Sequence, residues 1–147
     1  MHDDRLQEYI SFPDLDFDQE LEYIRNCINV VEVDRCEKWS IVLKENNITI
    51  GNISVNKVNE KHNYCEVGYV ISYDYWGNGY APEALKAVSD YLLKSGYYLV
   101  ECVCNKFNRQ SVMTMEKAGF KKDGYIPNRR LNKDGTYSGI CYYSKSN

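Results

Sequence analysis

The spacing of apolar residues changes along the chain from a helical pattern to a strand pattern. After Pro13, apolar residues recur at positions 17, 21, 24 and 28, which predicts a helix with one apolar face. Residues 38–44, 48–55 and 64–72 instead alternate between apolar and polar positions, with short polar turns between them. Consecutive strands with short connections predict an antiparallel meander.

The next segments predict a crossover between parallel strands. Residues 81–95 have helical spacing, with Pro82 at a position that a helix tolerates, and Gly96 ends the segment. A strand over residues 97–104 follows. Since a single helix then connects it to the strand over residues 64–72, these two strands should run parallel.

The last third of the chain predicts a short helix and two more strands. Asn108 stands where it would cap a helix that ends at Gly119. Strands are predicted near residues 120–125 and over residues 137–145, with an Asp-Gly turn before the second one. The order predicts an α+β fold, with one parallel joint inside a mostly antiparallel sheet and helices on both faces.

Composition indicates one ordinary domain over residues 1–147. The chain has 147 residues, of which 44% are apolar and 27% charged. No apolar run reaches the roughly 20 residues of a membrane span, and the N-terminus lacks the pattern of a signal peptide. We therefore expect a cytoplasmic protein with no membrane partner.

The cysteine and charge patterns limit the kinds of ligand that the protein is expected to bind. The six cysteines form no C-x-x-C pair and only two histidines accompany them, so we expect buried free thiols and no metal. The net charge is −3, yet residues 105–133 hold eight basic residues against two acidic ones. That surplus suits a polyphosphate ligand, although a solvated basic surface would have the same composition. We expect no nucleic-acid partner.

The segment YWGNGYAPEA, residues 75–84, carries the densest chemical signal. It lies between a predicted strand and a predicted helix, and its two glycines allow backbone N–H groups to turn toward one point at the helix N-terminus. Such a loop can hold a diphosphate, although a plain glycine turn is the alternative. The G-K-[ST] of a P-loop is missing, and so is the third glycine of a dinucleotide-binding loop.

Four motifs in order carry a family resemblance. They are EVGY (66–69), YWGNGYA (75–81) followed by EA (83–84), NRQS (108–111) and EKAGF (116–120). Their order and spacing resemble the GNAT superfamily of acyl-CoA-dependent N-acetyltransferases, in particular its RimJ/RimL-like branch, which acetylates the N-termini of ribosomal proteins. The likeness extends from about residue 10 to the C-terminus.

The resemblance implies how acetyl-CoA, the co-substrate, would bind. In this family the parallel strands splay, the pantetheine arm lies in the gap, and the diphosphate sits on the amides of the glycine loop. A backbone N–H of the splayed strand would stabilise the tetrahedral oxyanion. The implied cofactor-binding residues are Val70, Ile71, Trp76, Gly77, Asn78, Gly79, Tyr80, Ala81 and Asn108.

The resemblance also implies two catalytic residues. Glu66 would take the proton of the acceptor ammonium through water, unless it is simply a carboxylate on the sheet surface. Many members use a tyrosine to protonate the thiolate, but Met115 occupies that position here. Ser111 matches the serine of the RimJ/RimL-like branch and would take this role, unless it only satisfies helix backbone groups or water replaces it.

The sequence leaves the identity of the acceptor amine open. Tyr69, Tyr73 and Tyr75 lie near the implied site and could line an acceptor pocket. A peptide N-terminus is favoured by the resemblance, and a small polyamine or aminoglycoside comes next. A non-catalytic acyl-CoA-binding or sensor module is the alternative to an enzyme.

The sequence departs from the family pattern at both ends. It starts after the family's usual first strand and helix, so residues 38–44 would form an exposed edge strand unless residues 1–11 or another chain covers it. A homodimer through this edge is therefore expected. Near the C-terminus, Gly139 stands where the family commonly has an acidic residue, which weakens any inference about the acceptor.

Overall fold

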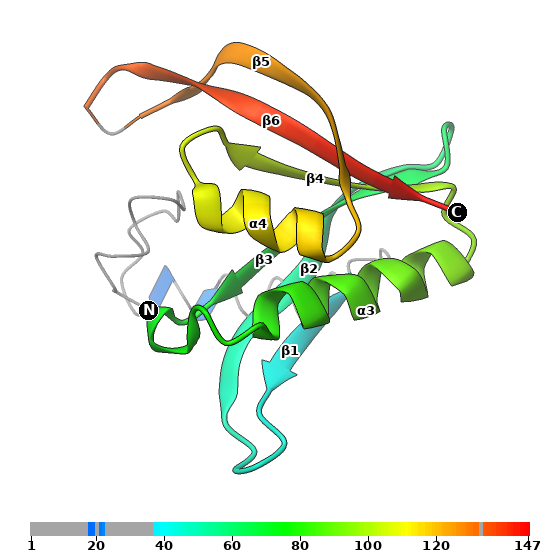
Figure 1. Cartoon of the computed structure of the whole chain (residues 1–147), viewed down its shortest axis with the longest axis vertical. Helices are drawn as coiled ribbons and strands as arrows, with labels where there is room; N and C mark the ends of the chain where they lie inside the picture. The colour runs from blue at the N-terminus through cyan, green and yellow to red at the C-terminus, as the bar shows by residue number, and fades with distance from the viewer. Residues whose placement is uncertain (1–17, 20, 23–36, 133) are drawn as a thin grey trace.

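The computed structural model describes residues 18–19, 21–22, 37–132 and 134–147. Its centre is a six-stranded sheet with the strand order β1-β2-β3-β4-β6-β5 (Figure 1). The elements are β1 (Lys38–Val42), β2 (Thr49–Asn59), β3 (Tyr64–Ile71), the short 3-10 helix η1 (Tyr73–Tyr75), α3 (Tyr80–Lys94), β4 (Leu99–Asn105), α4 (Arg109–Lys117), β5 (Lys121–Leu131) and β6 (Tyr137–Ser146). The predicted α+β class is confirmed.

The predicted meander is confirmed, because β1 and β3 both pair antiparallel with β2. β2 runs to Asn59, four residues beyond its predicted end at residue 55. Its pairing register shifts between Val55 and Lys57. This bulge interrupts the alternation of apolar and polar residues while the strand continues, which explains why the pattern predicted too short a strand.

The predicted parallel joint is confirmed and is short. β3 and β4 run parallel with α3 connecting them, and they are in register only at Tyr64↔Leu99, Cys65↔Val100 and Glu66↔Glu101. Beyond these pairs each strand continues without the other: β3 to Ile71 and β4 to Asn105. The two strands therefore diverge toward their C-terminal ends, as Figure 1 shows.

α3 and α4 cover one face of the sheet (Figure 1). Leu85 and Leu92 of α3 and Met115 of α4 are fully buried and belong to one hydrophobic cluster. The strands supply alternate residues to that cluster, as expected for a sheet with one face against helices. The strand residues in it are Ile53, Val55, Cys65, Val67, Val100, Cys102, Cys104, Cys141 and Tyr143.

Two strand boundaries differ from the prediction. β4 begins at Leu99 rather than residue 97, because the backbone N–H of Tyr97 still bonds to the carbonyl of Leu92 in α3. β5 extends to Leu131 rather than residue 125, through a register irregularity between Ile126 and Arg130. Bulges of this kind let a strand continue where its residue pattern stops.

Other expectations concern segments only partly described. Of the helix expected after Pro13, the described residues 18–19 and 21–22 are helical and the rest lies outside the described residues, so a helix on the second sheet face stays a prediction. β1 is the end strand of the described sheet. Pairing of its outer edge with a second copy likewise stays a prediction.

The cysteine expectation is confirmed where the structure covers it. Cys65, Cys102, Cys104 and Cys141 are free and buried, while Cys27 and Cys36 lie outside the described residues. Within the described part of the chain, no His, Cys, Asp and Glu side chains form a group that could hold a metal ion. No helix in that part combines the length and hydrophobicity needed to cross a membrane.

Candidate active site

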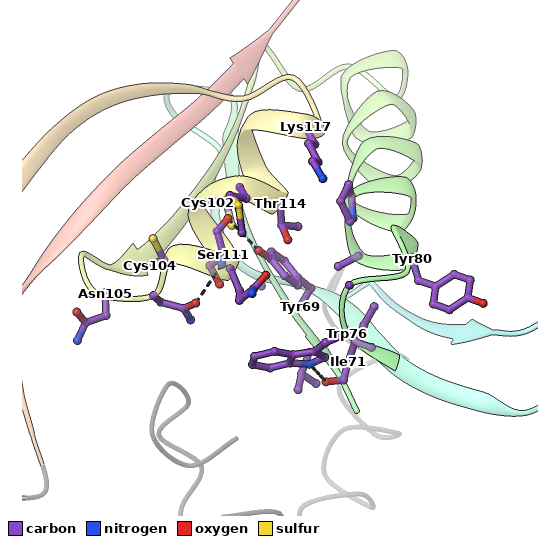
Figure 2. Close-up of a pocket in the computed structure, with 18 of the residues that line it drawn as sticks. Tyr69, Ile71, Trp76, Tyr80, Cys102, Cys104, Asn105, Ser111, Thr114 and Lys117 are labelled. Carbon is purple, nitrogen blue, oxygen red and sulfur yellow. Dashed lines mark hydrogen bonds between the residues drawn. The ribbon is translucent and has the colours of Figure 1, made fainter. Parts of the chain in front are cut away.

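A pocket occupies the gap where β3 and β4 diverge. Its volume is about 230 Å³, and both strands line it, together with the loop before α3 and the inner side of α4 (Figure 2). Pockets for compact ligands usually have about 300–1,000 Å³. A narrow gap of this size between two strands fits the thin arm of an extended ligand.

Hydrogen-bond alternation along β3 decides which peptide groups face this gap. Ser72 donates its backbone N–H to the carbonyl of Ile50 in the adjoining segment of β2. Because antiparallel pairs alternate, the peptide groups of Val70 also point toward β2, and those of Tyr69 and Ile71 point away from it, into the gap. Val70 lines the pocket, but Tyr69 and Ile71 are better placed to offer backbone groups to a ligand.

Trp76 forms a hydrogen bond with one of those backbone groups, the carbonyl of Ile71. Its indole Nε1 donates to the carbonyl oxygen of Ile71 over 2.8 Å, while its ring packs against Tyr73 with the ring centres 4.9 Å apart. Figure 2 shows the indole beneath the end of β3, beside Ile71. The carbonyl of Ile71 is thus satisfied within the protein, and the adjacent N–H of Ile71 is the group left to face the gap.

The glycine loop adopts the backbone that its composition predicts. Gly77 and Gly79 have φ angles of 78° and 84°, in the left-handed region that favours glycine. A Cβ at either position would meet nothing within 4 Å, so conformation, and not crowding, requires glycine here. Within the described chain, the N–H groups of residues 77–81 donate to no loop or turn carbonyl, and they stand at the N-terminus of α3.

The predicted loop residues do not all line the pocket. Trp76, Gly77, Gly79, Tyr80 and Ala81 do so. The side chain of Asn78 instead donates to the carbonyls of Tyr75 and Trp76, over 3.2 and 3.1 Å, which stabilises the turn from within.

The first turn of α4 supplies the opposite wall. The Asn108 side chain is the N-cap: its Oδ1 accepts the backbone N–H of Ser111 over 3.0 Å. Asn108 is buried and lines the pocket, and its amide Nδ2 donates to no described residue. Ser111 also lines the pocket, and its side chain lies within hydrogen-bond reach of the Tyr69 phenol. Both side chains therefore offer a donor to a ligand.

Tyr69 bridges β3 and α4 inside the pocket. Its hydroxyl donates to the carbonyl oxygen of Ser111 over 3.4 Å (Figure 2). Burial raises the pKa of Tyr69 far above its usual range, so the phenol stays protonated at neutral pH. Met115, by contrast, is fully buried in the core and does not line the pocket. Tyr69 is thus a neutral hydrogen-bonding group next to Ser111.

Glu66 lies at the vertex of the gap but outside the pocket lining. Cys65 and Val67 face α3, so strand alternation places Glu66 on the opposite sheet face. Its carboxylate Oε2 pairs with Lys57 Nζ at 3.0 Å, and the residue is 8% exposed. It is therefore near the splay without touching the side of the gap that α4 covers.

Glu101 is the site residue that the sequence prediction missed. It is the register partner of Glu66 on β4, and burial together with the charge of Glu66 raises its pKa above the usual range. Only the register of the parallel pair brings the two carboxylates together, and the residue pattern does not show that register. The vertex of the splay thus holds two carboxyl groups and one lysine, Lys57.

Some of the predicted tyrosines and basic residues line this pocket, and others lie outside it. Tyr69 and Tyr75 line the pocket, whereas Tyr73 packs on Trp76 outside the lining. From the basic segment 105–133, Lys117 and Arg130 line the pocket, and Figure 2 shows Lys117 extending from α4 toward α3. Lys106, Arg109 and Lys122 line a second groove instead.

Comparison with known proteins agrees with this geometry. Residues 1–121 match the family model described as an acetyltransferase (GNAT) domain. The uncharacterized N-acetyltransferase YnaD of Bacillus subtilis is 30% identical over 100 residues, which are 67% of this chain and 58% of YnaD. The chain thus spans little more than half the length of this relative.

Solved structures share the fold at low sequence identity. The ribosomal-protein-S5-alanine acetyltransferase from Vibrio fischeri is 18% identical with a TM-score of 0.82, over 97% of this chain and 80% of that one. The microcin C7 self-immunity acetyltransferase MccE, solved with acetyl-CoA and AMP, is 17% identical with a TM-score of 0.86, over 97% and 79%. The splayed strands, the glycine loop and the match to the family model together show that this chain belongs to the GNAT acetyltransferase family.

Proposed function

We propose that the protein transfers an acetyl group from acetyl-CoA to a primary amine by direct attack, without a covalent enzyme intermediate. The observation that carries the proposal is the short parallel joint, which opens a gap between β3 and β4 with the glycine loop at its mouth. The gap places unpaired strand edges next to the N-terminus of α3, where the amides of residues 77–81 donate to no loop or turn carbonyl of the described residues, and this combination suits an extended ligand that carries a diphosphate.

Backbone groups would hold the extended part of acetyl-CoA. The peptide groups of Tyr69 and the N–H of Ile71 would pair with the pantetheine arm, as a neighbouring strand would. The amides of residues 77–81 would bind the diphosphate, and Lys117 would add a positive charge. Asn108 would donate its Nδ2 to the arm.

Three groups would serve the chemical step. The N–H of Ile71 would stabilise the oxyanion that forms when the amine attacks the thioester carbonyl. Glu66 would accept the ammonium proton through water, from the sheet face opposite α4. Glu101, its register partner on β4, would add a second carboxyl group beside it. Ser111 would give the departing thiolate a proton. The serine would take its proton back from the nitrogen of the tetrahedral intermediate, which then leaves as a neutral amide beside the free thiol of CoA, so the transfer needs no redox cofactor.

For the acceptor we propose a peptide N-terminus, in line with the RimJ/RimL-like resemblance. The fold shared with a ribosomal-protein-S5-alanine acetyltransferase supports this choice without deciding it, because an identity of 18% carries the fold alone. A small-molecule amine is the second candidate.

The proposal is tested by incubating the protein with acetyl-CoA and a panel of peptide N-termini, polyamines and aminoglycosides while free thiol release is followed. Amine-dependent release of CoA is the expected result, and it should be fastest with peptides. Tight acetyl-CoA binding without thiol release on any amine would instead favour a non-catalytic acyl-CoA-binding or sensor module.

A further inference from the structure

A second groove lies on the outer side of α4, away from the pocket between β3 and β4. It has a volume of about 560 Å³ and is bounded by α4, β5, β6 and the loop between β4 and α4. Three basic side chains from these three segments line it: Lys106 from the loop, Arg109 from α4 and Lys122 from β5. Three cations that converge from separate elements favour a negatively charged occupant.

An exposed aromatic ring forms part of this groove. Tyr125 of β5 is 41% exposed and lies directly against Gly139 of β6, where a Cβ would collide with the ring atoms Cε2, Cζ and Oη. The ammonium of Lys106 lies 5.6 Å from the centre of the Tyr125 ring and 4.6 Å from that of Phe107. Glycine at position 139 thus makes room for an aromatic surface beside the cations.

The nearby acidic groups leave these cations unneutralised. The ion pairs of the described residues involve Lys57, Lys86 and Lys145, and no described carboxylate pairs with the three cations of the groove. Asp123 is next to Lys122 in the sequence but forms no ion pair with it in the described structure. Glu116 is on the same helix as Arg109, and its charge contributes to the raised pKa of Tyr143, after burial, so one carboxylate acts on a residue that lines the groove.

We propose that this groove is a binding site for a phosphate monoester carried on a flat ring, the chemistry of a nucleoside monophosphate. Lys106, Arg109 and Lys122 would hold the phosphate, since arginine and lysine match its charge and donor needs. Tyr125 would stack on the ring. The site is separate from the proposed acetyl-CoA site, because the two share only Met113 and take opposite sides of α4.

The test uses the full chain saturated with acetyl-CoA, so that the first pocket is already filled. Isothermal titration calorimetry would measure the binding of AMP, inorganic phosphate and uncharged adenosine. We expect AMP to bind with a dissociation constant in the range of about 10 µM to 1 mM, phosphate more weakly and adenosine weakest.

Matched variants locate the site. Lys122→Gln should weaken AMP binding about threefold to tenfold, whereas Lys121→Gln, a neighbour on the same strand outside the groove lining, should leave it unchanged. Tyr125→Leu should reduce the preference for AMP over phosphate. A thermal melt of each variant confirms that it is folded.

Three outcomes would overturn the inference: no AMP binding up to about 10 mM, AMP binding that disappears on saturation with acetyl-CoA, or equal weakening by the two lysine variants. None of them bears on the acetyl transfer proposed above, because the thiol-release assay needs no ligand in the second groove.

Discussion

Glu66 and Glu101 form the last register pair of the parallel joint, so two carboxyl groups stand side by side where β3 and β4 separate. Lys57 pairs with Glu66 at 3.0 Å, and Glu101 forms no ion pair with a described residue. Burial first, and then the like charge of Glu66 on the neighbouring strand, raises the pKa of Glu101. Such pairs are common where a protein needs a proton acceptor near neutral pH.

Removing the carboxylate of Glu66 tests the proposed base. Glu66→Gln should lower kcat about 100-fold while the dissociation constant for acetyl-CoA stays unchanged, because Glu66 does not line the pocket. Steady-state kinetics and calorimetry measure the two quantities. Lys57→Met is the matched control: it breaks the same ion pair but keeps the carboxylate, so its kcat should fall less than about tenfold. Equal losses in the two variants would show that the ion pair, not a base, matters.

Glu101 should affect stability in a pH-dependent way. Because burial raises the pKa of Glu101 above 4.5, the folded protein binds this proton more tightly than the unfolded chain. Its contribution to stability is complete below pH 4.5 and is lost as pH rises through the folded-state pKa. At neutral pH, Glu101→Gln should therefore raise the free energy of unfolding by up to about 1 kcal/mol, a gain that fades in acid. Thermal melts across pH would contradict this if the gain grew as pH fell.

Ser111 should matter for the rate and not for the fold. Its backbone N–H donates to Asn108 Oδ1 and does not depend on the side chain, while its hydroxyl shares one side-chain hydrogen bond with Tyr69. Ser111→Ala should therefore change the free energy of unfolding by no more than about 1 kcal/mol. Its kcat should fall about 10-fold to 100-fold if the hydroxyl protonates the thiolate. Ser111→Cys keeps a proton donor and should recover part of the rate. An unchanged kcat in Ser111→Ala would assign this proton to water.

The glycine loop can be tested by adding one methyl group. Gly79→Ala places a Cβ at a φ of 84°, which costs about 1–2 kcal/mol of stability, and it should also weaken acetyl-CoA binding about tenfold. Gly124→Ala is the control, since Gly124 has ordinary φ and nothing within 4 Å of an added Cβ. Calorimetry with acetyl-CoA and thermal unfolding measure both effects. Equal affinities in the two variants would contradict a role for the loop in binding.

The sequence predicted those features that depend on local chemistry. The two glycines, the asparagine cap at position 108 and the single-helix crossover are local, and all three are present. Glu101 could not be predicted because only the parallel register brings it beside Glu66. The need for glycine at position 139 could not be predicted either, because it comes from the Tyr125 ring on the neighbouring strand, which leaves no room for a Cβ. Contacts between distant segments, unlike turns and caps, leave no periodic signal in the chain.

A crystal structure of the protein with bound CoA would show whether the gap between β3 and β4 holds the ligand. We expect the diphosphate on the amides of residues 77–81 and the pantetheine arm between β3 and β4, bonded to the backbone of Tyr69 and Ile71. A diphosphate bound away from residues 77–81, with the gap between the strands empty, would contradict it.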